Sequence, residues 1–284
     1  MKERAGFRTF AALLGSVLAG GAIARVWRSY ARFQRDFVPI LAYHALTNEP
    51  RERHEMKVQR AQFERQMGWL ARHGYVTAPS TQLASEAPTG RRVGVSFDDG
   101  FASVHQFALP VLRKLGLRAT VFVSTDYVGH TAQFPWDYAA GDPPLTWAQI
   151  DELRAGGFEI GSHACSHREL PQLDDGELAR ELQESCRIVR QATGEAPKTL
   201  AYPHGSFDER VKSATARAGY AAAFAVYSQP EQADAFSVPR ILIRNQTSLL
   251  GFRLRIWGLH PFLKSRGFVG LLRPWLVRLR WAFL

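Results

Sequence analysis

The stretch VGVSFDDG, residues 93–100, places two adjacent carboxylates directly after an apolar run. The run from Val93 to Phe97 is typical of a buried strand, and Gly100 indicates the turn that leaves it. Neighbouring side chains on a strand point to opposite faces, but the backbone can turn where the strand ends. We therefore expect Asp98 and Asp99 to reach one pocket and to have different roles there.

A second stretch, HACSH at residues 163–167, offers two imidazoles four residues apart, just after the apolar run from Phe158 to Gly161. One Asp and two His form a known ligand set for a catalytic divalent metal with open positions for water and substrate. The other Asp is then free to act as a base. A metal, a base and a water molecule together predict a hydrolase.

Strand-like and helix-like runs alternate along the middle of the chain, which favours an α/β fold with a parallel sheet. Apolar residues recur at helical spacing over residues 62–73 and 175–192, and Thr146-Trp147-Ala148-Gln149 has the form of a capping box. Short apolar runs at residues 119–123, 199–202 and 221–225 predict further strands. Periodicity alone does not distinguish an open sheet from a closed barrel.

With AYPHG at residues 201–205, these motifs resemble in order and spacing those of the polysaccharide deacetylase family, the NodB-homology domain. The resemblance covers about residues 39–244. It implies a distorted (β/α)7 barrel with its active site at the carboxyl ends of the strands. It also implies a metal-dependent hydrolase that removes N-acetyl groups from amino sugars of a polysaccharide or a lipid-linked glycan. The implied cofactor is a divalent metal, with Zn²⁺ favoured.

The family motifs assign a role to each site residue. Asp98 corresponds to the general base, and Asp99, His163 and His167 correspond to the metal ligands. The third motif, with Tyr202, Pro203 and His204, would contact the substrate and supply a backbone N–H to the oxyanion. Cys165, between the two histidines, is interpreted as a packing residue.

The general acid is expected at an unusual place. Many family members carry this histidine in a late Leu-x-His motif, but residues 237–244 contain no histidine. Tyr43-His44 follows the first apolar strand and resembles the poly-N-acetylglucosamine deacetylase branch. The first and last strands of a closed barrel are neighbours, so His44 would occupy an equivalent place. We assign His44 as the general acid; a structural role is the alternative.

Two further residues are candidates for supporting roles. The third motif often begins with an Arg that steadies the catalytic Asp, but this chain has Ala201 there. Arg240, on a late strand, could replace it or be an ordinary surface residue. Trp136 could stack on a sugar ring, and burial is the competing interpretation.

The net charge of +10 lies at the two ends of the chain. Residues 1–36 carry +5 and residues 251–284 carry +7, which leaves the middle at −2. We expect a basic and apolar N-terminal segment (1–36), a catalytic domain (37–250) and a basic, aromatic-rich tail (251–284). Basic residues mixed with Trp, Phe and Leu suit an anionic membrane surface. No nucleic-acid motif accompanies them, so we expect no nucleic-acid partner. An amphipathic helix packed on the barrel is the alternative for the tail.

The N-terminal segment allows three interpretations. Its apolar run from Phe10 to Ala24 is short for a membrane span and is followed by four arginines. A cleaved signal, an uncleaved anchor and a helix in the membrane plane all remain open. We expect a membrane-associated protein of the cell envelope, on either the periplasmic or the cytoplasmic face.

Three other functions remain open. A deformylase or another amidase acting on a lipid-linked amino sugar would use the same residues. A catalytically weak glycan-binding module would fit the missing Arg at position 201. A membrane scaffold would make the two tails the functional parts.

Overall fold

The computed structural model describes residues 20–86, 90–130, 134–136, 139, 141–226 and 233–265. The chain forms two compact units. The larger unit, Val38–Pro261, holds every strand of the described residues and is called the barrel body here. The smaller unit contains the segments up to Phe37 and from Phe262 onwards.

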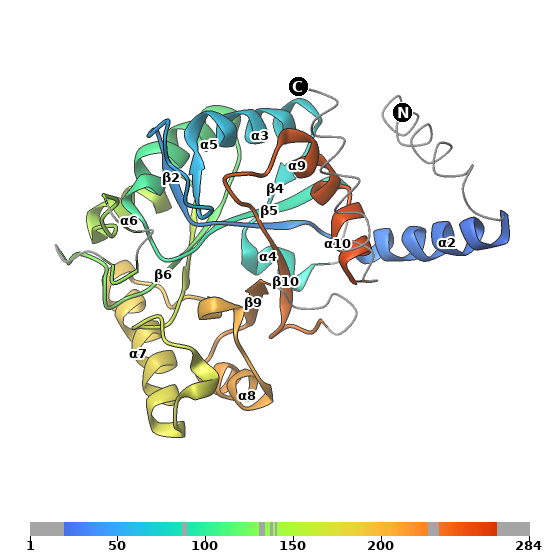
Figure 1. The fold of residues 1–284 in the computed structure, drawn as a ribbon. Helices are drawn as coiled ribbons and strands as arrows, with labels where there is room; N and C mark the ends of the chain where they lie inside the picture. The colour runs from blue at the N-terminus through green and yellow to red at the C-terminus, as the bar shows by residue number, and fades with distance from the viewer. Residues whose placement is uncertain are drawn as a thin grey trace. The chain divides into compact units, whose positions relative to one another are not determined.

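Seven parallel strands close into a barrel (Figure 1). They are β1 (Ile40–Tyr43), β5 (Arg92–Phe97), β6 (Thr120–Val123), β7 (Glu159–Ser162), β8 (Thr199–Ala201), β9 (Ala222–Val226) and β10 (Val238–Leu242). The chain order runs around the barrel from β5 to β10, and β1 pairs with both β10 and β5. The expected closed barrel is therefore confirmed, and its first and last strands are neighbours. A short strand, β4 (Val76–Thr77), extends the sheet beside β5, and β2 (Ala45–Thr47) pairs with β3 (Lys57–Gln59).

Helices follow the strands and cover the outside of the barrel (Figure 1). They are α3 (Arg60–Arg72), α4 (Ser80–Ser85), η1 (Val104–Ala108), α5 (Leu109–Leu115), α6 (Trp147–Ala155), η3 (Leu170–Gln172), α7 (Asp175–Thr193), η4 (Pro203–Gly205), α8 (Glu209–Arg217) and α9 (Leu249–Ile256). Helix α10 (Leu259–Ser265) crosses the boundary between the two units. Helix α3 packs against α5 and α9, and α7 packs against α8. The predicted capping box is present, because Thr146 Oγ1 accepts from the Gln149 N–H while the Gln149 side chain accepts from the Thr146 N–H.

The core of the barrel body reaches beyond the predicted domain boundary at residue 250. Helix α9 buries Phe252 and Ile256, which join the same hydrophobic cluster as Leu41, Val95 and Phe97. The first part of the predicted tail thus packs on the barrel, as the amphipathic-helix alternative expects. Residues 266–284 of the tail lie outside the described residues.

Helix α2 (Gly20–Asp36) is the main element of the smaller unit. Its Tyr30 and Phe33 rings contact the Phe262 ring at centroid distances of 5.3 and 5.7 Å. In the part of the chain that the structure describes, no helix has the length and apolar character needed to span a bilayer. Most of the predicted apolar run from Phe10 to Ala24 lies outside the described residues.

Candidate active site

The predicted site residues gather at the carboxyl ends of the barrel strands. His44 follows β1, Asp98 and Asp99 follow β5, and His163 follows β7. The third motif follows β8, and Arg240 lies within β10. Because parallel strands present their carboxyl ends on one side of a barrel, residues from distant parts of the sequence share one site.

Asp99, His163 and His167 form a buried cluster whose candidate ligand atoms lie within 4.8 Å of one another. The Nε2 atoms of both histidines lie 3.3 Å from Asp99 Oδ1. His163 Nδ1 lies 2.7 Å from the Ala201 carbonyl oxygen, which can only accept, so the ring proton is on Nδ1. The Nε2 lone pair of His163 is therefore directed at the cluster, as a metal ligand requires. The three donor types fit a divalent metal.

Strained backbone is concentrated in the same three motifs. Among the described residues, four residues other than glycine have φ in the left-handed region: Asp99 (71°), Ala164 (61°), His167 (61°) and His204 (58°). Such conformations persist only where surrounding contacts enforce them, and they cluster at functional sites. Two of the three candidate ligands are therefore held in conformations that the chain would not adopt in isolation.

Asp98 is held by Arg240 through two parallel hydrogen bonds. Arg240 Nη1 donates to Asp98 Oδ1 at 2.6 Å, and Nη2 donates to Oδ2 at 2.8 Å. Burial alone would raise the pKa of Asp98, but the charge of Arg240, with help from His163 and His44, lowers it. Asp98 is thus kept ionised and oriented. The guanidinium also lies 5.2 Å from the Phe122 ring centre and donates to Ser96 Oγ.

His44 is half-buried beside this pair of aspartates. Burial lowers its pKa, whereas the nearby charges of Asp99 and Asp98 act in the opposite direction. The position matches the expectation from the Tyr43-His44 pair, because β1 and β10 are hydrogen-bonded neighbours.

Aromatic rings extend the site beyond the cluster. The centroids of the Trp136 and His167 rings are 4.6 Å apart. The centroids of the His204 and His167 rings are 4.5 Å apart, and these two rings meet edge to face. Trp136 therefore packs on a candidate ligand and keeps part of its surface exposed. His204 lies in the tight turn η4, whose two closing hydrogen bonds come from the N–H groups of Gly205 and Ser206. Neither bond uses the His204 N–H.

The predicted substrate contact of Tyr202 needs correction. Its ring is fully buried and stacks on Phe207, and its hydroxyl donates to the Phe236 carbonyl at 2.9 Å. Its N–H donates to the Phe224 carbonyl. Tyr202 therefore anchors the turn to neighbouring segments, and Pro203 begins that turn as a buried residue.

The sequence interpretation overlooked two polar residues of the site. Ser96 accepts from Arg240 and donates to the Leu41 carbonyl, and it stands within the first motif itself. Glu181 contacts the loop between His163 and His167. Its signal in the sequence is an acidic residue within the apolar face of α7, next to Leu178 and Leu182. Cys165 is buried and is not part of the Asp–His–His cluster.

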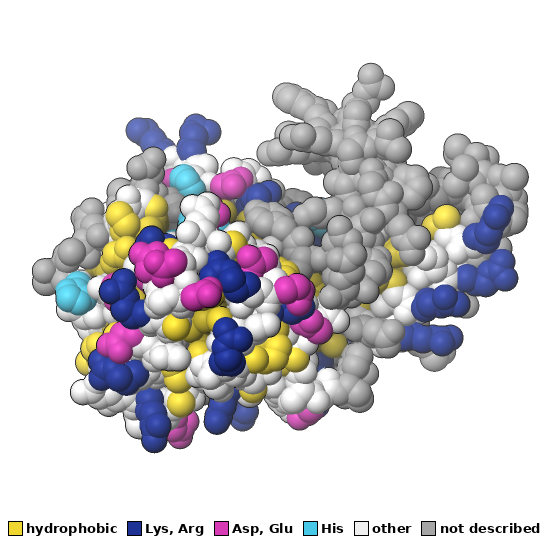
Figure 2. Space-filling view, turned by 90° about the horizontal axis from the view of Figure 1, so that it is seen from below, with side chains coloured by type: hydrophobic (Ala, Val, Ile, Leu, Met, Phe, Trp, Pro, Cys, Tyr) yellow, Lys and Arg dark blue, Asp and Glu magenta, His cyan; other side chains and the backbone are white. Residues whose placement is uncertain are grey.

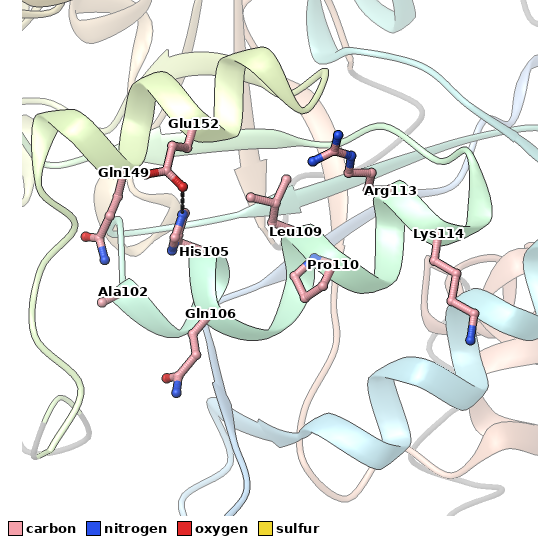
Figure 3. Close-up of a pocket in the computed structure, with 9 residues that line it drawn as sticks. All are labelled: Ala102, His105, Gln106, Leu109, Pro110, Arg113, Lys114, Gln149 and Glu152. Atoms are coloured by element: carbon pink, nitrogen blue, oxygen red, sulfur yellow. Dashed lines mark hydrogen bonds and ion pairs between the residues drawn. The ribbon is translucent and has the colours of Figure 1, made fainter.

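A pocket on the outer surface is separate from this cluster (Figure 3). It is lined by residues of η1, α5 and α6, including His105 and Glu152, whose side chains are 2.8 Å apart. None of its lining residues is one of the predicted site residues.

The fold and the cluster define a parallel barrel protein with a candidate metal centre at the carboxyl ends of its strands. Residues 85–223 match the family model described as polysaccharide deacetylase. This match agrees with the three sequence motifs, and residues 85–223 contain all three candidate ligands.

Relatives with known names agree with this match. The chain is 28% identical over 188 residues to YxkH of Bacillus subtilis (strain 168), whose name places it among the polysaccharide deacetylases. This match covers 64% of the chain and 62% of the relative, so the chain spans less than two thirds of that protein. Identity is 24% over 202 residues to the poly-β-1,6-N-acetyl-D-glucosamine N-deacetylase of Staphylococcus aureus (strain MSSA476), covering 66% of the chain and 67% of the relative.

The fold also resembles a solved structure, the Streptococcus pyogenes deacetylase PplD in complex with acetate. The TM-score is 0.66 at 22% identity, and the match covers 77% of the chain and 97% of that structure. At this identity the likeness concerns the fold alone.

Proposed function

We propose that this protein is a metal-dependent hydrolase that removes N-acetyl groups from the amino sugars of a glycan. The observation that carries the proposal is the Asp99–His163–His167 cluster beside an aspartate that is paired with an arginine. The match of residues 85–223 to the polysaccharide deacetylase family model supports the substrate class. We propose Zn²⁺ as the metal, because it is commonly bound by two imidazoles and a carboxylate with a position left open.

A metal held by Asp99, His163 and His167 would supply an activated water and polarise the acetyl carbonyl. The residues around the cluster have separate tasks. Asp98, ionised and oriented by Arg240, accepts a proton from the attacking water at one of its carboxylate oxygens. The His204 N–H, which the turn η4 leaves unused, donates to the oxyanion.

Cleavage of the amide requires a proton on the departing nitrogen. We propose that His44 donates this proton, because it follows β1, the strand paired with β10, and lies within the field of both aspartates. A lowered pKa makes the protonated ring a better donor, because the acid form is then less stable. Trp136, partly exposed against His167, offers a face on which a sugar ring could stack.

The proposal is tested by acetate release from a panel of N-acetylhexosamine oligomers, with metal content measured on the same sample. We expect acetate release that disappears after chelation and returns with Zn²⁺. Release of formate from N-formylated amino sugars, without acetate release, would favour the deformylase alternative. Glycan binding by the metal-loaded protein, with no release of either acid, would favour the glycan-binding module instead.

We also propose that α2 attaches the protein to an anionic membrane of the cell envelope, lying in the membrane plane. Its four arginines recur every three or four residues, as Arg25, Arg28, Arg32 and Arg35, and are exposed. Figure 2 shows basic side chains gathered along this helix, whereas the visible face of the barrel body mixes acidic and basic groups. Val26 and Trp27 are 47% and 37% exposed and could enter the headgroup region.

Vesicle sedimentation tests this attachment. Replacing the four arginines of α2 with Gln should weaken binding to phosphatidylserine vesicles, because each arginine contributes roughly 1 kcal/mol near such a surface. The control replaces four exposed arginines of α7 and α8, Arg180, Arg187, Arg190 and Arg217. Equal weakening by both variants would contradict the proposal, as would binding that does not respond to salt.

A further inference from the structure

Two candidate ligands stand at the ends of one short loop. His163 begins the loop directly after β7, and His167 ends it. The backbone of Ala164 and of His167 is left-handed, with φ of 61° at both. A left-handed residue other than glycine costs roughly 1–2 kcal/mol, so contacts outside the loop must hold it in this conformation.

The side chain of Glu181, from α7, provides such contacts. Glu181 Oε2 accepts from the N–H groups of Cys165 and Ser166 at 2.8 and 2.9 Å. Glu181 Oε1 accepts from the Ser166 hydroxyl. The residue is only 4% exposed, so its carboxylate lies within the protein and is solvated by the loop itself.

Other backbone groups of the loop are also hydrogen-bonded, but to neutral partners. The Ala164 N–H donates to Ser162 Oγ at 3.1 Å. The carbonyls of Ala164 and Cys165 accept from the N–H groups of Thr125 and Asp126 at 3.2 and 3.1 Å. Charge-assisted hydrogen bonds are roughly twice as strong as neutral ones. Glu181 therefore forms the strongest link between the loop and the helix behind it.

We propose that Glu181 is a positioning residue that holds the loop in the one conformation in which both imidazoles face Asp99. It is not one of the candidate ligands, and it acts through the backbone of Cys165 and Ser166. The metal affinity depends on this loop conformation, because ligands that must first be ordered bind a metal more weakly. The inference rests on the metal site of the proposed function.

The test compares Glu181→Gln with Glu184→Gln. Both substitutions remove one negative charge from α7 at nearly constant volume, but the Glu184 side chain is 40% exposed and pairs with Arg187. Zn²⁺ affinity is measured by competition with a chromophoric chelator. Glu181→Gln should bind Zn²⁺ about 10- to 100-fold more weakly, as is typical when the support of a metal ligand is lost. Glu184→Gln should bind as the unchanged protein does.

Hydrogen exchange of the metal-free proteins gives a second readout. Amides of residues 163–167 should exchange faster in Glu181→Gln and at the unchanged rate in Glu184→Gln. Folded Glu181→Gln with unchanged Zn²⁺ affinity would overturn the proposal, and so would equal weakening by both variants. If Glu181→Gln fails to fold, Ser166→Ala decides: weaker Zn²⁺ binding supports the proposal, and unchanged binding overturns it. An unchanged protein that binds no Zn²⁺ would overturn the metal site of the proposed function and this inference with it.

Discussion

Asp98 and Asp99 are neighbours in the chain, yet their surroundings give them different chemistry. Asp98 is bound on both oxygens by a guanidinium, whereas Asp99 faces two imidazoles. The backbone at Asp99 is left-handed, with φ of 71°, and the two side chains have different partners. One strand end thus serves two roles.

Isosteric substitutions separate these roles. Asp98→Asn should retain Zn²⁺ and lose turnover by about 10²- to 10⁴-fold, since a positioned base contributes on that order. Asp99→Asn should lose Zn²⁺, because an incomplete ligand set cannot hold the ion. Metal analysis and acetate release on both variants check this. If Asp98→Asn loses as much Zn²⁺ as Asp99→Asn does, the assignment of Asp98 as base and Asp99 as ligand is wrong.

His44 is tested by the leaving group. His44→Ala should lose more turnover on an N-acetylglucosamine oligomer than on an aryl acetate, because an amine must be protonated to depart and a phenolate need not be. Parallel kinetics on both substrates give the result. His105→Ala, in the outer pocket, is the control and should leave both rates unchanged. Equal losses on the two substrates for His44→Ala would remove His44 from the mechanism.

At the scale of the element, the strands and helices that the sequence predicted lie within one or two residues of those in the structure, whereas helices such as α4, α5 and α8 were not predicted. The helix expected from Asp175 to Ala192 is Asp175–Thr193, and the strand expected from Val93 to Phe97 is Arg92–Phe97. Apolar runs and capping residues act on neighbouring residues, so they can be recognised from the sequence alone. The hydrogen bonds of Glu181 and the burial of Tyr202 against Phe207 could not be predicted in this way, because they depend on segments brought together by folding.

The turn η4 depends on a glycine for lack of space as well as for its backbone angle. Gly205 has φ of +70°, and a Cβ there would lie 2.6 Å from the Val226 carbonyl oxygen. Gly194, at the end of α7, has φ of +79° with nothing within 4 Å of a Cβ. Gly205→Ala should therefore reduce the free energy of unfolding by about 1–3 kcal/mol more than Gly194→Ala does. Urea denaturation measures the difference, and equal losses would contradict it.

At the scale of the whole molecule, the end of the barrel body can be located by truncation. A chain that ends at Pro261 keeps Phe252 and Ile256, which are 0% and 4% exposed, whereas a chain that ends at Ser248 loses both. Loss of one buried Phe side chain alone costs about 3–5 kcal/mol. The longer chain should therefore unfold near the midpoint of the full protein, and the shorter one at a much lower urea concentration. A low midpoint for the longer chain as well would show that residues beyond 261 contribute to the core. A shorter chain as stable as the full protein would contradict the role of α9.

The closure of the barrel through β1 and β10 also limits how the protein can be divided. The segment shared with the family, residues 85–223, contains all three candidate ligands but lacks β1, β10 and most of β9. Expressed as a separate fragment, it would expose unpaired strand edges and would leave Asp98 without Arg240. Unpaired edges recruit other chains, so such a fragment should aggregate. The shortest active fragment should therefore be longer than the segment that matches the family model, because it must include β1 and β10.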